Sequence, residues 1–459
     1  MRVFLAFIVA IVLVAAGVFV YAGHLPGPSI VINQPTKFVG QSTPVDVVVT
    51  APAAKLTALR VVFEQNQKAT PLFSLDRPEA SSSAKQEGSN SVHVTATAGR
   101  ATVPDIKSGP ARISVTAERV VLFGLRKVST TATRDVEVRL ERPQISVIST
   151  KHYINLGGSE MIVYRVTPSD VESGVRVGDD TYPGYPASGV QIPDIHIADP
   201  AVKVAFFALL WDQDVNTPMY AYAKDQAGNT ARADFDHLTF PKPFKKSNIK
   251  IDDAFLNRVV PQILDTTSEV NPQGDLVQKF LVINGDLRKK NAATIASYAK
   301  QTSPDLLWGG DVFHSFKNNA VEAAFADQRT YFYQGKEIDR QTHLGFDLAR
   351  VVHSPIVAAN RGKVLHAGPL GIYGNAVIID HGMGVQSLYG HMSQILVKVG
   401  QMVDKEQQIG ISGETGLAGG DHLHFTMLVN GQMVNPVEWW DAHWIQDRIV
   451  RKLREASGG

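Results

Sequence analysis

An apolar run near the N-terminus constrains this chain most. Residues 3–22 read VFLAFIVAIVLVAAGVFVYA, twenty residues without a charge. A helix of about twenty residues spans roughly 30 Å, the thickness of the hydrocarbon core of a bilayer. Arg2 precedes the run, and the positive-inside rule therefore keeps the N-terminus inside. We expect residues 1–23 to form a membrane anchor and the rest of the chain to lie outside.

The same segment has a second interpretation, as a signal peptide that is removed after export. Val20, Tyr21 and Ala22 would then provide a poor cleavage site. The apolar run is also longer than a usual signal core of about 7–15 residues. Its length favours an uncleaved anchor, and both interpretations export the rest of the chain.

Charge and cysteine content exclude several classes of protein. The formal net charge is +1, whereas a nucleic-acid-binding protein normally carries a basic surplus or a basic stripe. We therefore expect no nucleic-acid partner. Cysteine is absent, which excludes a disulfide framework, a thiolate metal site and a cysteine nucleophile. Any metal site in this chain must use histidine and carboxylate ligands.

Two strand-rich segments follow the apolar run, residues 30–143 and residues 144–240. Runs such as VDVVVT (45–50) and RDVEVRL (134–140) alternate apolar and polar residues or are rich in β-branched ones, as half-buried strands do. Several short strands separated by Gly, Pro, Ser and Asn predict a β-sandwich for each segment. The turn DQAGN (225–229) between two strands looks like the last hairpin of an immunoglobulin-like module.

The rest of the chain changes character twice. Residues 241–326 contain two stretches of helical periodicity and are predicted to form a helical connector. From residue 327 to residue 440 strands return with many glycines, which predicts an antiparallel β domain. Residues 441–459 form an amphipathic tail. A helix docked on its own domain is the favoured interpretation of this tail, and contact with a membrane surface is the alternative. The predicted fold class is mainly β.

A pair of histidines stands in a predicted strand near the C-terminus. Alternate residues of a strand face the same side, so His422 and His424 project together, about 7 Å apart at the backbone. Leu423 and Phe425 point the other way, into a core. The chain has 14 histidines, so such a pair can arise by chance and is by itself a weak sign of a metal site.

His343 and Asp347 are a second weak signal. On a straight strand they would lie about 13 Å apart, whereas the ligand atoms around one zinc ion lie about 3–3.5 Å apart. The chain must therefore bend between them if they share a metal, and Gly345 allows a bend. His391 follows an apolar strand and precedes a polar turn, and taken alone it is an ordinary loop histidine.

Taken together, these short patterns resemble a known family. Residues from about 329 to 440, about a quarter of the chain, are similar to the lysostaphin/LytM-type peptidoglycan endopeptidases, with the motifs in the same order. The motifs are HLGFD (343–347), PIVAA (355–359), GKV (362–364), YGNAVIIDHG (373–382), YGHM (389–392), VG (399–400), GISGETG (410–416), HLHF (422–425) and NP (435–436).

The resemblance implies a small antiparallel β-sheet domain with its site in a groove. It also implies zinc-dependent hydrolysis of peptide bonds in peptidoglycan stems or cross-bridges. At the matching positions, His343, Asp347 and His424 would be the zinc ligands, and His422 and His391 the catalytic histidines. The N-terminal helix would hold the protein in the cell inner membrane, with its bulk in the periplasm or otherwise outside. The β-sandwich modules would carry the active domain to the wall or bind an envelope protein.

The sequence departs from the family pattern mainly before His343. Tyr331–Tyr333 and Gln334–Gln341 are interpreted as a loop that rims the groove, where it would affect substrate preference. The motifs H-E-x-x-H and G-x-S-x-G and a P-loop are absent. Other histidines of the C-terminal part are interpreted as core or surface residues: His314, His353, His366, His381 and His443. Of these, His381 stands in the turn Asp380-His381-Gly382 and is interpreted as a structural hairpin residue.

Two other functions stay open. Some relatives of this family have lost their metal ligands and act as scaffolds that bind the wall and activate other hydrolases. The five intact positions in this chain argue against that function, because three protein ligands leave a fourth zinc position for water, as catalytic sites do. A third interpretation is an export or polymer-assembly factor that uses the domain only to dock on the wall.

Overall fold

The prediction of a mainly β chain is confirmed: strands hold 45% of the residues and helices 19%. The chain divides into two compact units, residues 1–143 with 224–231 and residues 144–223 with 232–459. The computed structural model describes residues 2–51, 56–77, 80–87, 90–314 and 316–458.

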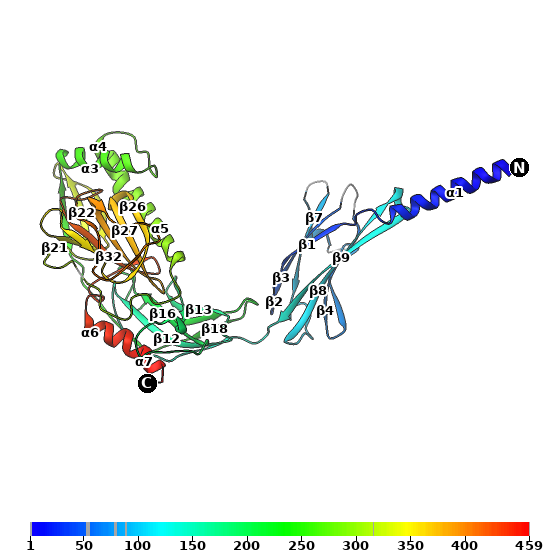
Figure 1. The fold of residues 1–459 in the computed structure, drawn as a ribbon, viewed down its shortest axis with the longest axis horizontal. Coiled ribbons are helices and arrows are strands. Elements are labelled where there is room, and N and C mark those ends of the chain that lie inside the picture. Colours follow the sequence, from blue (N-terminus) through cyan, green and yellow to red (C-terminus); the bar gives the residue numbers. More distant parts are fainter. Residues whose placement is uncertain (1, 52–55, 78–79, 88–89, 315, 459) are drawn as a thin grey trace. The chain divides into compact units, whose positions relative to one another are not determined.

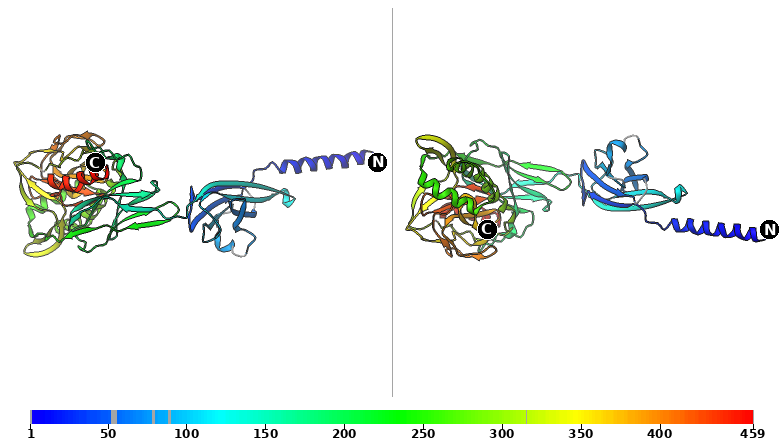
Figure 2. Two further views of the ribbon diagram at one scale, coloured as in Figure 1. Left: turned by 90° about the horizontal axis from the view of Figure 1, so that it is seen from below. Right: turned by 90° about the horizontal axis from the view of Figure 1, so that it is seen from above.

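The apolar run forms one helix, α1 (Arg2–Ala22; Figures 1 and 2). Its side chains from Val3 to Tyr21 are exposed rather than packed in a protein core. The helix ends where the Gly23 N–H donates to the Val20 carbonyl at 3.0 Å. Val3–Ala22 is long and apolar enough to cross a membrane, a property that a signal sequence shares.

The first unit contains a β-sandwich. One sheet has the order β1-β3-β7-β6 and the other β2-β9-β8-β4-β5. Alternate residues of β3, among them Val45 and Val47, are buried and share one apolar core with Leu59 and Val61 of β4. The strands are β1 (Ser29–Gln34), β2 (Phe38–Val39), β3 (Thr43–Thr50), β4 (Leu56–Gln65), β5 (Lys68–Ser74), β6 (Ala84–Glu87), β7 (Ser91–Ala98), β8 (Gly109–Val121) and β9 (Arg126–Val138).

A second set of sheets lies between residues 144 and 240, with the orders β10-β12-β16-β15, β14-β13-β17-β18 and β11-β19. The predicted turn is present: the Asn229 N–H donates to Asp225 Oδ1 at 2.7 Å, and Gly228 has φ = +89°. The strands are β10 (Gln144–Val147), β11 (His152–Asn155), β12 (Ser159–Thr167), β13 (Glu172–Val177), β14 (Asp180–Pro183), β15 (Tyr185–Pro186), β16 (Val202–Ala208), β17 (Met219–Lys224), β18 (Thr230–Ala233) and β19 (His237–Phe240).

Helices follow, as predicted, in the middle of the next segment. They are α3 (Asp253–Thr266), α4 (Leu276–Val282) and α5 (Arg288–Ser297), and they lie beside the C-terminal sheet (Figure 1). Asp252 caps α3 by accepting from the Phe255 N–H at 2.8 Å. Asn291 of α5 accepts from the Ile372 N–H at 2.9 Å, so the helices are bonded to the domain that follows them.

The two ends of this segment also contain strands, which the prediction of a helical connector did not include. β20 (Lys246–Ile251) pairs in parallel with β22 (Asp327–Tyr333), and β21 (Ala320–Ala323) pairs with β24 (Phe346–Ala349). Both partners lie beyond residue 326. Such a strand is stabilised by pairing with a partner that is distant in the sequence. Its own residues therefore give little indication that it is a strand.

The C-terminal sheet has the order β21-β24-β32-β28-β27-β26-β30, with β33 on the side of β32. Smaller sheets, β20-β22-β23 and β25-β31-β29, accompany it. The remaining strands are β23 (Lys336–His343), β25 (Pro355–Val357), β26 (Gly362–Pro369), β27 (Asn375–Gly382), β28 (Val385–Met392), β29 (Gln394–Ile395), β30 (Met402–Val403), β31 (Gln408–Ile411), β32 (Leu423–Val429) and β33 (Gln432–Val434).

The expected loop at Tyr331–Tyr333 and Gln334–Gln341 is a β-hairpin instead. β22 and β23 form a hairpin in which Tyr333 pairs with Lys336, and the turn residues Gln334 and Gly335 have φ = +48° and +78°. Most side chains of β23 are polar and partly or fully exposed. A strand without apolar alternation gives no periodic signal, which is why the sequence suggested a loop.

The C-terminal tail is a docked helix, as the favoured interpretation held. It consists of α6 (Ala442–Ile445), a π-helical turn and α7 (Arg451–Ala456). Ile445, Ile449 and Leu453 are buried. Lys452 Nζ lies 2.8 Å from Glu160 Oε1 of β12, and neither side chain is exposed. A buried ion pair of this kind holds the tail against the second set of sheets.

His381 of β27 is buried in the core of the C-terminal domain. Its Nδ1 lies 2.8 Å from the Arg361 carbonyl, to which it donates, and its Nε2 accepts from Ser387 Oγ at 2.7 Å. Burial lowers the pKa of His381 from 6.5 to about 4. The structural role expected for His381 agrees with these contacts.

We expect this histidine to make the fold acid-sensitive. Between pH 6.5 and about 4 the unfolded chain binds a proton at His381 and the folded chain does not, so stability falls as the pH decreases. The loss is about 3 kcal/mol when this window is crossed completely. Urea unfolding of the wild type and of His381→Asn, at pH 7 and pH 4, measures it. An equal pH dependence in both proteins would contradict the assignment.

Candidate metal centre

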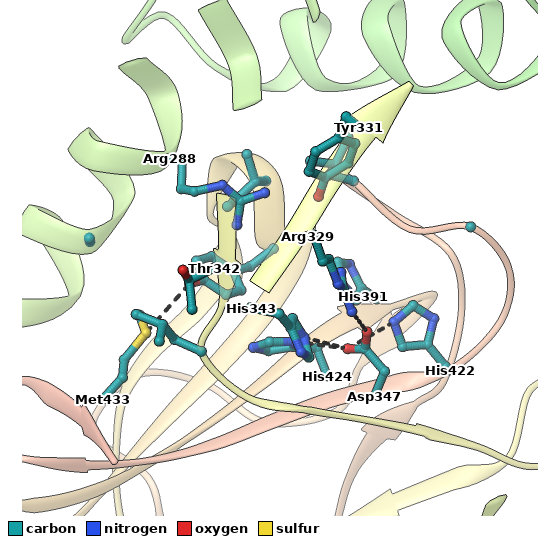
Figure 3. A pocket seen from close by; sticks show the side chains of 16 residues that line it. Arg288, Arg329, Tyr331, Thr342, His343, Asp347, His391, His422, His424 and Met433 are labelled. Atoms are coloured by element: carbon teal, nitrogen blue, oxygen red, sulfur yellow. Dashed lines mark hydrogen bonds and ion pairs between the residues drawn. The ribbon is translucent and has the colours of Figure 1, made fainter. Parts of the chain in front are cut away.

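All five residues singled out in the sequence line one pocket of the C-terminal domain (Figure 3). His343 ends β23, Asp347 lies in β24, His391 lies in β28 and His424 lies in β32. His422 immediately precedes β32. All five side chains are buried.

Three of the five side chains converge on one point. His343 Nε2 lies 2.9 Å from Asp347 Oδ1 and 3.0 Å from His424 Nδ1, and His424 Nδ1 lies 3.1 Å from Asp347 Oδ1. Strand pairing brings them together, because Asp347 is opposite His424 in the β24–β32 ladder. Two residues separate β23 from β24, and this break supplies the bend that the sequence required.

The donor set suits a divalent cation. Two imidazole nitrogens and a carboxylate oxygen are zinc-type ligands, and bonds of about 2.0–2.2 Å place such ligands about 3–3.5 Å apart. Burial raises the pKa of Asp347, but the charge and hydrogen bonds of the surrounding histidines outweigh it and hold that pKa well below its ordinary value. Burial lowers the pKa of His424 to about 4. Asp347 and His424 therefore offer lone pairs at neutral pH.

Gly345 is needed for space rather than for an unusual backbone angle. A Cβ at this position would lie 2.4 Å from Cε1 and 2.5 Å from Nε2 of His424, and Gly345 is not among the residues with positive φ. The sequence therefore pointed to the correct glycine for an incomplete reason. The close approach of the backbone to a ligand ring is what excludes a side chain here.

His391 and His422 lie beside the three ligands. The Nδ1 of His391 donates to the Thr415 carbonyl at 2.7 Å, and the Nδ1 of His422 donates to the Gly420 carbonyl at 2.8 Å. Each of these bonds holds the ring proton on Nδ1 in the neutral imidazole. The lone pair of Nε2 is therefore free to accept a proton in the pocket. The two ring centroids are 4.7 Å apart, and His422 Nε2 lies 3.4 Å from Asp347 Oδ1.

The pKa values of His391 and His422 are shifted in opposite directions. Burial lowers the pKa of His391 well below its ordinary value, and the nearby His422 and His424 lower it further. Burial also lowers the pKa of His422, but the hydrogen bond and charge of Asp347 outweigh it and the pKa of His422 is raised. Neighbouring titratable groups whose pKa values are driven apart can divide acid and base roles between them.

Arg329 is a residue of this site that sequence reasoning missed. Its Nη2 donates to Asp347 Oδ2 at 2.8 Å, so one carboxylate oxygen faces the histidines and the other faces the arginine. Asp327, on the same face of β22, lies 3.5 Å from Arg329 Nε. The alternation of Asp327, Arg329 and Tyr331 was the available signal, because alternate residues of a strand share one face.

A basic surface continues from the pocket. A second hollow shares Arg288, Arg329, Thr342 and Leu344 with it. We call this hollow the cationic groove, after its four basic residues: Lys246, Arg288, Arg329 and Arg340. No acidic residue is among the described residues that line it. Arg288 projects from α5 toward the pocket (Figure 3). It donates to the backbone carbonyl of Asn284 at 3.0 Å and to the side-chain Oδ1 of Asn284 at 2.6 Å, and neither acceptor is charged.

Comparison with known proteins identifies the domain. The model of peptidase family M23 matches residues 341–436. Residues 341–436 are an M23 peptidase domain of the LytM/lysostaphin type. The match contains all five pocket residues and begins two residues before the first of them. The resemblance found in the sequence is thereby confirmed.

Several known proteins share the M23 domain. Peptidoglycan DD-endopeptidase ShyA of Vibrio cholerae is 40% identical over 96 residues, 21% of this chain and 22% of that protein. DD-carboxypeptidase/endopeptidase Mpg of Neisseria meningitidis is 42% identical over 95 residues, 21% of this chain and 22% of that protein. The chain thus matches about a fifth of the length of these curated relatives.

Solved structures give matches as well. A putative M23 peptidase from Pseudomonas aeruginosa is 18% identical, with 62% of this chain and 95% of that chain covered and a TM-score of 0.36. The catalytic domain of lysostaphin from Staphylococcus simulans is 28% identical, with 27% and 92% covered and a TM-score of 0.24.

We expect Gly345→Ala to disrupt the metal centre. The added methyl group would overlap the His424 ring and move Nδ1 out of reach of the other two ligands. The metal content of the purified protein, measured by mass spectrometry, should fall from about one ion per chain to nearly none. Gly419→Ala is the matched control, because Gly419 also lines the pocket but has open space at the Cβ position. Equal metal content in the two variants would contradict this account.

Proposed function

We propose that this protein is a zinc-dependent endopeptidase that hydrolyses peptide bonds in peptidoglycan stems or cross-bridges. The observation that carries the proposal is the buried triangle of His343 Nε2, Asp347 Oδ1 and His424 Nδ1, with two oriented histidines beside it. Support comes from the M23 domain and from the names of its relatives, which are peptidoglycan DD-endopeptidases and a DD-carboxypeptidase/endopeptidase.

In this proposal His343, Asp347 and His424 hold the zinc ion. The chemistry that bound zinc supplies is polarisation of the substrate carbonyl and activation of water at the position that three protein ligands leave open. Arg329 positions Asp347 through the bond to Oδ2, and it compensates the charge of a carboxylate that is almost completely buried.

The two remaining histidines divide the proton transfers. His422 Nε2 faces the ligands, 3.4 Å from Asp347 Oδ1, and accepts the proton of the attacking water as general base. The His391 ring lies beside the His422 ring, and its Nε2 can serve as that base or, once it has taken up a proton, donate to the developing oxyanion. Both rings are fixed by backbone carbonyls, so little reorganisation is needed during the reaction.

The proposed location depends on α1 being an uncleaved anchor. An uncleaved anchor places the two units outside the inner membrane, where peptidoglycan lies. The division into an anchor (1–23), two β-sandwich modules (30–143 and 144–240), a connector (241–326) and a peptidase domain (327–440) is part of the same proposal.

We expect His422→Ala to lower kcat/KM by about 10²–10⁴-fold, the usual contribution of a general base, while the protein keeps its metal. Asp347→Ala should lose both metal and activity. Mass spectrometry of muropeptides released from purified peptidoglycan measures cleavage. His443→Ala is the control, because that side chain is 85% exposed and lies outside the pocket. A zinc-loaded wild type that releases no muropeptide would overturn the enzymatic function and favour the scaffold alternative.

The cationic groove gives an expectation about the substrate. Stem peptides carry free carboxylates, and Arg288 lines both the pocket and the groove without an acidic partner in its recorded bonds. A charge-assisted hydrogen bond contributes about 1.5–3 kcal/mol, so Arg288→Gln should raise KM about tenfold or more with little change in kcat. Lys289→Gln, at an exposed neighbouring position, should behave as the wild type.

Amidated stem peptides distinguish carboxylate binding by Arg288 from a purely structural role of that residue. If Arg288 binds a carboxylate, its substitution affects the cleavage of stem peptides with free carboxylates but not that of amidated ones. An equal effect on both substrates would contradict carboxylate recognition.

A further inference from the structure

The β8–β9 hairpin extends beyond the sheet to which it belongs. Its two strands stay paired up to Val121 and Arg126, whereas the pairing of the neighbouring strand β4, in its described residues, reaches Arg119. Residues Leu122–Leu125 connect the strands at the end of this extension. We call Leu122–Leu125 the apolar tip.

The apolar tip exposes large side chains to an unusual degree. Phe123 is completely exposed (104%) and Leu125 is 73% exposed, and Phe123 has the highest exposure recorded for a large apolar side chain in the described part of the chain. Leu122 and Phe123 also have φ = +52° and +53°, a region that bulky residues rarely occupy. A strained turn that holds apolar groups away from the protein indicates a binding role for them.

The helix α1 lies against this hairpin. Arg126 Nη1 donates to the Phe19 carbonyl, and the Arg126 guanidinium lies 4.7 Å from the centre of the Phe19 ring. Arg119 Nε donates to the Pro26 carbonyl at 2.9 Å. Figure 1 shows the end of α1 beside the hairpin. Two arginines of the hairpin thus bind the last turn of α1 and the linker that follows it.

The depth of the apolar tip follows from these contacts. The Arg126 guanidinium contacts Phe19, near the C-terminal end of the apolar run Val3–Ala22. The linker approaches the tip along β9, because Gly27 lies against Thr130 and Gly23 against Arg126. One to two further strand residues extend the tip about 3–7 Å past Arg126. This distance matches the depth of about 5–10 Å at which apolar groups sit in the boundary between headgroups and acyl chains.

We infer that the apolar tip inserts into the lipid bilayer beside α1 and forms a second membrane contact of this protein. The occupant of this surface is phospholipid, because the surface is continuous with the one segment in the described chain that is long and apolar enough to cross a membrane. Arg126 and Lys127 stand at the base of the tip, where they meet anionic headgroups. Two contacts restrict rotation of the first sandwich about α1, which a single helix does not.

The absence of cysteine allows a direct test in the full-length protein. Single cysteines at Leu125, at Val12 in α1 and at Gln67 are labelled with an environment-sensitive fluorophore. Gln67 lies in the exposed turn between β4 and β5, so it is the matched control for a hairpin tip. The proteins are reconstituted in vesicles of phosphatidylethanolamine and phosphatidylglycerol, with and without nitroxide-labelled lipid.

The labels at Leu125→Cys and Val12→Cys should show blue-shifted emission and quenching by the nitroxide lipid, and the label at Gln67→Cys should show neither. Adding Phe123→Ser to Leu125→Cys should reduce the quenching at 125 and leave that at 12 unchanged. A quenched label at 12 with an unquenched label at 125 would overturn the inference while α1 remains an anchor. Unquenched labels at both positions would overturn the anchor as well, and neither result depends on peptidase activity.

Discussion

The carboxylate of Asp347 is the contact on which the site depends. Its Oδ1 lies within 2.9–3.4 Å of nitrogens of His343, His424 and His422, and its Oδ2 accepts from Arg329. An almost completely buried charge is tolerated only when partners surround it, and here the partners are the residues proposed for catalysis. They come from three strands: Arg329 from β22, His343 from β23, and His424, with His422 just before it, from β32. Correct pairing of β22, β23, β24 and β32 is therefore a condition for the site, so fold and chemistry are coupled.

The surroundings keep this arrangement rigid. Behind the C-terminal sheet, Glu438 accepts from Asn155 Nδ2 and from the Ser159 N–H, both at 2.9 Å, and the Trp439 indole donates to Ser159 Oγ at 3.0 Å. These bonds join the segment that directly follows the M23 domain to the second set of sheets within one compact unit. Those sheets thus support the peptidase domain directly, beyond the spacer role expected from the sequence. The first sandwich belongs to the other unit, where it contacts α1.

Much of the site was predictable because its residues stand in short motifs. The spacing H-x-H on a strand fixes two histidines on one face, and the HLGFD motif requires a bend that the break between β23 and β24 provides. Arg329 was not predictable in the same way. It acts through a carboxylate 18 residues away, on a strand whose hairpin partner is polar and looks like a loop. The roles assigned to the five pocket residues remain predictions until variants are measured.

The sequence by itself determined the apolar helix, the mainly β character, the middle helices and the five pocket residues, because these depend on local periodicity and on short motifs. Only the tertiary structure decided which residues surround them. Three such contacts join segments that are distant in the chain. β20 pairs in parallel with β22, Arg288 of α5 lines the pocket, and Arg126 donates to the Phe19 carbonyl of α1. Such contacts arise from packing and strand register, and these leave no local pattern in the sequence.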